Sequence, residues 1–327
     1  MIKQLVFSML AIAGMVSCNS HNDHPYDPSN QTKINLGVSV GEIVSKAAIN
    51  PQEKNVFTTE DDIYLIRTDI NDGDVLPPLD GVEEVKIDLN KKFILPSKWQ
   101  NYDGEKESFF TGYYPAGLFN TGTGSNPSWV SFVEVNGEKD IVYALPYSVG
   151  TKETPTTNPV LTFKHILSQI QINVVGGVAG QRAFGKIKKI SIMDIPTSIN
   201  LYLNVKEDQE VEKADNSPET HVVIYEDADG MVIPKTSTPI GVVPMIFHGG
   251  AAPYGTSTTP LVLSVETENE GLKSVAVTNI GGTGDAATGL EMGKKHTITL
   301  TFKDKIVVSA DITPWDPNGN SGGGDVE

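Results

Sequence analysis

Leu161-Thr-Phe-Lys-His-Ile-Leu-Ser-Gln-Ile-Gln-Ile-Asn-Val174 is the stretch of sequence that decides the fold. From Gln169 to Val174 polar and apolar residues alternate without interruption, so that one face carries Ile170, Ile172 and Val174. This period of two is typical of a β-strand with one buried face.

The first half of the same stretch has the opposite parity. Leu161 and Phe163 stand on odd numbers, so the alternation slips between His165 and Ser168. A bulge or a tight turn has to absorb one residue there if both halves face one core. A connector rich in threonine and proline precedes the stretch, at residues 151–159. We therefore expect this stretch to begin the second of two β-domains.

Short strands separated by turn residues are predicted on both sides of it. In the first half they lie at 33–40, 62–67, 85–89, 92–95, 108–115, 129–135 and 140–144. In the second half they lie at 187–192, 199–205, 221–225, 231–233, 240–247, 261–265, 272–277, 297–302 and 306–315, and Asp229-Gly230 indicates a hairpin turn. No helical period lasts ten residues. The pattern predicts an all-β protein built from two tandem β-sandwich domains.

The chain of 327 residues divides into five predicted segments. They are a lipoprotein signal peptide at 1–17, a polar tether at 18–32, an N-terminal β-sandwich domain at 33–158, a C-terminal β-sandwich domain at 159–315, and a flexible glycine-rich tail at 316–327. Two domains also agree with the usual size of about 150 residues for each.

The charge composition of the chain limits the kinds of partner that it can bind. Asp and Glu outnumber Lys and Arg by 41 to 25, and the formal net charge is −16. A strongly acidic chain is a poor partner for nucleic acid, so we expect none. Hydrophobic residues make up 39% of the chain, which is enough for real cores.

The N-terminus predicts export and lipidation. An apolar segment from Leu5 to Ala13 is too short to span a bilayer permanently, and it leads to Met15-Val-Ser-Cys18. This ending resembles the lipobox of bacterial lipoproteins, in which the signal is cut before a cysteine that is then acylated. Cys18 is the only cysteine, so no intramolecular disulfide can form. We expect an outer-membrane lipoprotein with its lipid anchor on Cys18.

No motif for catalysis, for a cofactor or for a metal site stands out. We therefore expect a protein that is not an enzyme and that needs no cofactor or metal. Aromatic residues such as Trp99 and Trp129 are candidate glycan-stacking residues, although aromatics in strands more often pack in a core.

Several weak motifs in a fixed order resemble the fimbrillin family, the subunits of the type V pili of Bacteroidales. Together they cover nearly the whole mature chain. They are Cys18, the strand Ile34 to Val40, Ser45-Lys-Ala-Ala48, Tyr113-Tyr-Pro115, Phe163-Lys-His165, Ser168, Met292 to Leu300, and Ile312-Thr-Pro-Trp315.

The resemblance implies a mechanism of assembly. In that family a trypsin-like protease removes the first strand, and a strand from the next subunit fills the apolar groove that is left. The removable strand here would carry Ile34, Leu36, Val38 and Val40. The family cut follows an arginine, whereas the matching position here is Lys46. Either a lysine-tolerant protease cuts at Lys46, or the subunit stays unprocessed as a cap or anchor, or the chain never polymerises.

The function that the sequence favours is that of a stalk, tip or anchor subunit of a pilus at the cell surface. Its partners would be other pilus subunits through strand addition, the membrane through the lipid anchor, and a host or microbial surface receptor. The alternative is a non-catalytic glycan-binding surface lipoprotein of a polysaccharide-uptake system. The fate of the first strand separates the two, because only a pilus subunit needs that strand to be removable.

Overall fold

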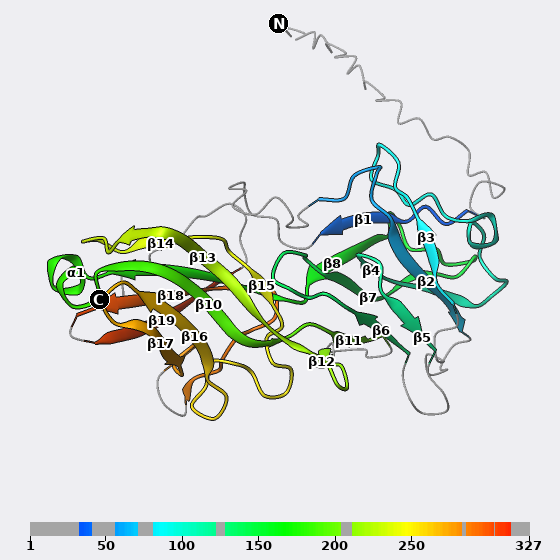
Figure 1. Cartoon of the computed structure of the whole chain (residues 1–327). Helices are drawn as coiled ribbons and strands as arrows, with labels where there is room; N and C mark the ends of the chain where they lie inside the picture. The colour runs from blue at the N-terminus through cyan, green and yellow to red at the C-terminus, as the bar shows by residue number, and fades with distance from the viewer. Residues whose placement is uncertain are drawn as a thin grey trace, which may run out of the picture.

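The computed structural model describes residues 33–40, 56–70, 81–121, 128–203, 211–282, 286–303 and 305–314. These residues are almost all in strands or loops, so the predicted all-β class is confirmed. One short α-helix, α1 (Gly177–Phe184), and one 3-10 turn, η1 (Ser97–Trp99), are the helical elements that the structure describes over their whole length. Figure 1 shows two β-lobes side by side, the first at right and the second at left.

The first lobe contains a six-stranded sheet and a four-stranded sheet. The six-stranded sheet has the order β1 (Gly37–Val40), β8 (Val160–His165), β7 (Val142–Gly150), β4 (Glu107–Tyr114), β2 (Ile63–Ile70) and β3 (Glu83–Val85). The four-stranded sheet has the order β12 (Val211–Lys213), β11 (Ile199–Tyr202), β6 (Trp129–Phe132) and β5 (Leu118–Asn120).

The six-stranded sheet is buried on both faces. On strand β7, Val142 and Ala144 belong to one hydrophobic cluster and Tyr143, between them, belongs to another. The second cluster also contains Val130 of β6 and Leu201 of β11, so it joins the two sheets of the lobe. The first cluster lies on the opposite face, and it is the one that includes the residues of β1.

The second lobe is a sandwich of two further sheets. One has the order β13 (Glu219–Val232), β10 (Lys186–Pro196), β16 (Leu261–Thr267) and β17 (Gly271–Val277). The other has the order β14 (Thr238–Ile240), β9 (Ser168–Val175), β18 (Lys294–Phe302) and β19 (Ile306–Pro314), and β15 (Met245–Ile246) also pairs with β9.

One hydrophobic cluster fills the space between the sheets of the second lobe. Ile170, Ile172 and Val174 of β9 are fully buried in it, as their alternation predicts. At one end of the sandwich α1 packs against β18, where the rings of Phe184 and Phe302 meet edge to face at 5.3 Å. The predicted strands at 261–265 and 272–277 lie in the antiparallel pair β16–β17, and those at 297–302 and 306–315 lie in the antiparallel pair β18–β19.

The predicted domain boundary does not match the division of strands between the lobes. β8 begins just after residue 158, yet it pairs with β1 and β7 of the first lobe. The parity slip therefore marks the passage of the chain from one sheet to another, at Ile166 and Leu167, rather than a bulge within one strand. The chain later returns, because β11 pairs with β6 in the first lobe.

The predicted hairpin at Asp229-Gly230 is also wrong. β13 runs through both residues as one strand of 14 residues beside β10. The register jumps there, because Ile187 pairs with Met231 whereas Lys189 pairs with Glu226. Gly230 has a φ of 71°, so the glycine serves a bulge in the strand rather than a chain reversal.

Candidate functional site

The first strand is the element on which the expected function depends, and its apolar face is buried. Ile34, Leu36, Val38 and Val40 expose 6%, 0%, 9% and 6% of their surface. Regular pairing begins at Gly37, later than the predicted start at Lys33. All four side chains pack in the cluster that contains Phe93 and Phe163. Burial of four such side chains contributes roughly 1.5–3 kcal/mol each before chain entropy is counted.

β1 lies in a slot with two walls. On one side it runs parallel to β8, from Gly37 opposite Val160 to Val40 opposite Phe163. On the other side it faces residues 91–93, where Val38 N–H donates to Lys91 O at 3.0 Å and Phe93 N–H donates to Leu36 O at 2.9 Å. A strand in this position therefore satisfies backbone groups on both walls.

The place of β1 in the sheet makes it separable. It is the terminal strand of the six, so its removal breaks no pairing among the other five. The cost would instead be the exposure of the apolar cluster and of unpaired backbone groups of β8.

The slot is tightly packed around Gly37. A Cβ atom there would lie 3.2 Å from Val160 Cγ2, 3.3 Å from Pro159 O and 3.4 Å from Lys92 Nζ. Its own N–H donates to Pro159 O at 2.7 Å. The two walls approach each other here closely enough to restrict the side chain that can stand at this position.

Two of the predicted site residues, Cys18 and Lys46, lie outside the described residues. The described part of the chain contains no helix with the length and apolar character that a membrane crossing needs.

The two candidate glycan-stacking residues have different surroundings and are not brought together in one platform. Trp99 is the last residue of the turn η1 and packs against the same cluster as β1, with its ring edge to face with that of Phe110 at 6.0 Å. Trp129 lies on β6, where its ring is 6.4 Å from that of Tyr202 on the neighbouring strand β11. Trp99 is thus a packing residue, and Trp129 belongs to a cross-strand aromatic pair.

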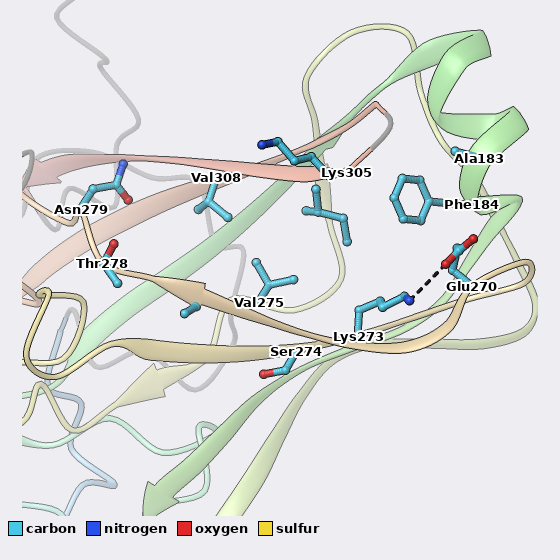
Figure 2. A pocket seen from close by; sticks show the side chains of 12 residues that line it. Ala183, Phe184, Glu270, Lys273, Ser274, Val275, Thr278, Asn279, Lys305 and Val308 are labelled. Atoms are coloured by element: carbon cyan, nitrogen blue, oxygen red, sulfur yellow. Dashed lines mark ion pairs between the residues drawn. The ribbon is translucent and has the colours of Figure 1, made fainter.

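A cavity of about 720 Å³ opens at one side of the second lobe, between the edge strands β17 and β19. Figure 2 shows Val275 and Val308 pointing into it from the two strands, with Phe184 of α1 at one end. Two lysines lie at its rim, and Lys273 pairs with Glu270 at 3.1 Å. Neither Trp99 nor Trp129 lines this cavity.

Titratable groups in the described residues do not converge on one site. No three side chains of His, Cys, Asp and Glu gather there as a metal site would require. His165 Nδ1 lies 2.8 Å from Asp140 Oδ2 in a buried pair. Burial lowers the pKa of His248 to about 4, and it also lowers the pKa of His296.

The walls of the slot were not found from sequence. The predicted strand at 92–95 contains Lys92 and Phe93 but not Lys91, and no partner is predicted for it. No pattern points to Gln100, whose carbonyl accepts the N–H of Ile34 at 2.8 Å. A weak signal was present in Arg67, a charged residue that directly follows the hydrophobic residues Ile63 to Ile66 of a predicted strand. Such a charge has to find internal partners when the strand is buried.

The family model for fimbrillin-like proteins matches residues 52–315. This chain belongs to the fimbrillin-like family. The match begins after β1. It therefore includes β8 and residues 91–93, which form the walls of the slot, but not the first strand itself.

Solved structures with this fold support the architecture of the fimbrillin-like chain. A presumed cell adhesion protein from Bacteroides uniformis is 14% identical, with a TM-score of 0.53, over 87% of this chain and 98% of that one. Another from Bacteroides ovatus is 13% identical, with a TM-score of 0.51, over 86% and 97%. A third from Parabacteroides distasonis is 11% identical, with a TM-score of 0.51, over 88% and 98%. No curated protein matches the chain.

Proposed function

We propose that this fimbrillin-like protein is a structural subunit of a type V-like pilus that assembles by strand addition between subunits. The observation that carries the proposal is the setting of β1. It is a terminal strand with four buried apolar side chains, held between β8 and residues 91–93. A strand of another subunit with the same alternation would satisfy both the apolar pockets and the backbone groups.

Removal of the first strand is the step that makes the slot available. Lys46 follows β1 by six residues, so a cut after it would release the strand and leave β2 to β19 in one chain. A protease that accepts lysine would then convert the subunit into an acceptor. Without such a protease the subunit would end or anchor a pilus, because its own strand would keep the slot filled.

Attachment to the outer membrane would come from Cys18. The apolar leader that precedes this cysteine supports cleavage and acylation there, and more than one acyl chain gives firm anchoring. We expect Cys18→Ala to move the protein from the membrane fraction to the soluble fraction. Unchanged partitioning into detergent would contradict the anchor. At the surface the pilus would contact a host or microbial receptor.

Limited trypsin digestion tests strand replacement. We expect trypsin to cut first after Lys46, and the trimmed protein to remain folded and to form multimers that resist mild heating. N-terminal mass spectrometry identifies the cut, and gel filtration before and after heating measures the multimers.

A Lys46→Gln variant is the matched control for this digestion. It should lose the first cut and remain monomeric under the same conditions. If the trimmed wild-type protein unfolds, or stays monomeric with an empty slot, the chain does not assemble by strand replacement.

A further inference from the structure

The turn at residues 97–101 forms the end wall of the slot. Its Gln100 carbonyl accepts the N–H of Ile34 at 2.8 Å, and Asn101 bridges to Lys33. These contacts hold the start of the first strand, upstream of its pairing with β8. The position of this turn therefore decides where a strand in the slot begins.

A buried arginine fixes this turn to the sheet. The side chain of Arg67 on β2 is 3% exposed. Its Nη1 donates to Trp99 O at 3.0 Å and to Asn101 O at 2.8 Å, so it binds the carbonyls on either side of Gln100.

The rest of the guanidinium is held by the sheet itself. Nε donates to Asp69 Oδ1 at 3.0 Å on β2, and Nη2 donates to Ser108 Oγ at 3.1 Å on β4. Ser108 in turn donates to Asp69, which completes the network. None of these partners belongs to β1, so the network does not depend on the first strand being present.

We propose that Arg67 is a positioning residue that holds the turn 97–101 as a preformed end wall, and so sets the register of any strand that fills the slot. The part concerning an incoming strand rests on the proposed function. Lysine cannot replace this residue, because a single ammonium cannot reproduce the planar fork that joins the two carbonyls to Asp69 and Ser108.

The preformed wall defines the chemistry of the strand that is accepted. Such a strand needs a backbone N–H at the place of Ile34, which excludes proline there. It needs apolar side chains at four alternate positions from that point. It also favours a small residue at the place of Gly37, where a Cβ atom would lie within 3.4 Å of both walls.

Amide hydrogen exchange of the intact chain tests the positioning role. In Arg67→Lys we expect the N–H of Ile34 to exchange about tenfold faster, because its acceptor loses its support. The N–H of Gly37, bonded to Pro159 O on the β8 side, should change much less. Arg182→Lys is the matched control, since Arg182 is the other arginine and lies exposed on α1.

Equal acceleration at Ile34 and Gly37 would mean general loosening and would overturn the proposal, as would no change at either. If Arg67→Lys fails to fold, Ser108→Ala removes two bonds of the network, those to Arg67 and Asp69, and leaves both bonds from Arg67 to the turn. In this variant the exchange rate of the Ile34 N–H should still increase about threefold more than that of the Gly37 N–H.

The yield of heat-resistant multimers after trypsin treatment is the second readout. It should fall in Arg67→Lys and stay unchanged in Arg182→Lys. If even the wild-type protein yields no multimers, strand replacement fails while the exchange experiment still decides whether Arg67 holds the turn. If multimers form equally well with Arg67→Lys, the role of Arg67 in setting the register is wrong.

Discussion

The two lobes differ in what lies at the edge of their sheets. In the first lobe β1 fills the slot beside β8, and its four apolar side chains are buried. In the second lobe β17 and β19 end their sheets on the same side, and a cavity of about 720 Å³ remains between them.

The difference lies in what each opening offers to a strand. The slot of the first lobe has backbone partners on two walls, an apolar floor and an end wall. The opening of the second lobe has an apolar floor, but Lys273 and Lys305 lie at its rim. Lysines at a sheet edge are a common protection against unwanted pairing. The comparison therefore predicts that Lys273 and Lys305 protect the second opening against pairing with another strand.

The largest effect is expected from Leu36→Ala. Leu36 is fully buried in the slot, so the variant should lower the free energy of unfolding by about 2–5 kcal/mol. Leu272→Ala on β17 is the matched control, because Leu272 is 68% exposed and should change stability by no more than about 0.5 kcal/mol. Urea unfolding followed by tryptophan fluorescence measures both, since Trp99 packs against the cluster of Leu36. Equal effects would remove the distinction between the two edges.

Acidification should lower the stability of the chain through His248. The ring of His248 lies 5.1 Å from that of Phe247, which is buried in the cluster that joins the two sheets of the first lobe. His248 follows β15, and burial lowers its pKa to about 4. Below pH 6.5 the unfolded chain binds a proton that the folded His248 refuses, so stability falls between pH 6.5 and about 4, by up to about 3 kcal/mol.

Substitution of this histidine isolates its share of the pH effect. His248→Gln stays neutral, so its urea midpoint should fall less between pH 6.5 and 4 than that of the wild type. His221→Gln, at a side chain that is 56% exposed, should keep the wild-type slope. An unchanged slope in His248→Gln would assign the acid sensitivity to other groups.

The smallest effect on stability, and a distinct effect on association, is expected from Lys273→Val. Lys273 lies on the edge strand β17 beside the exposed Leu272, so its replacement makes this edge more apolar and removes the ion pair with Glu270. The free energy of unfolding should change by less than about 0.5 kcal/mol, while sedimentation at rising concentration should reveal self-association. Lys152→Val, at an exposed position between β7 and β8, should stay monomeric. A monomeric Lys273→Val would show that the lysine does not protect this edge.

Local pairing could be predicted from sequence, whereas the assembly of sheets could not. The hairpins β16–β17 and β18–β19 follow from alternation on both sides of short turns. The bulge at Gly230 was predicted as a hairpin because a glycine with positive φ serves both structures. The return of β11 to β6 pairs Ile199 with Phe132, and no local signal specifies such a distant partner.

In the candidate site too, the local strand pattern could be predicted from sequence, whereas its distant partners could not. The alternation from Ile34 to Val40 predicts a strand with one apolar face, and burial follows that pattern. The walls at residues 91–93 and at Gln100 bind the strand through backbone atoms, and every residue has these atoms, so no sequence pattern identifies them. Their support by Arg67 depends on a network over β2, β4 and the turn, which only the folded chain brings together.

The pairing of β1 with β8 also has a consequence for the order of folding. Gly37 and Val160 are 160 − 37 = 123 positions apart, and even the nearest wall, at Lys92, is 92 − 37 = 55 positions away. The other strand pairs of the six-stranded sheet join partners closer in sequence, such as Ile63 with Val85. Distant contacts form late, because closure of a long loop costs more entropy than closure of a short one. We therefore expect the first strand, although it leaves the ribosome early, to be the last to enter the sheet, which pulse-labelled amide exchange during refolding would show as late protection at Val38.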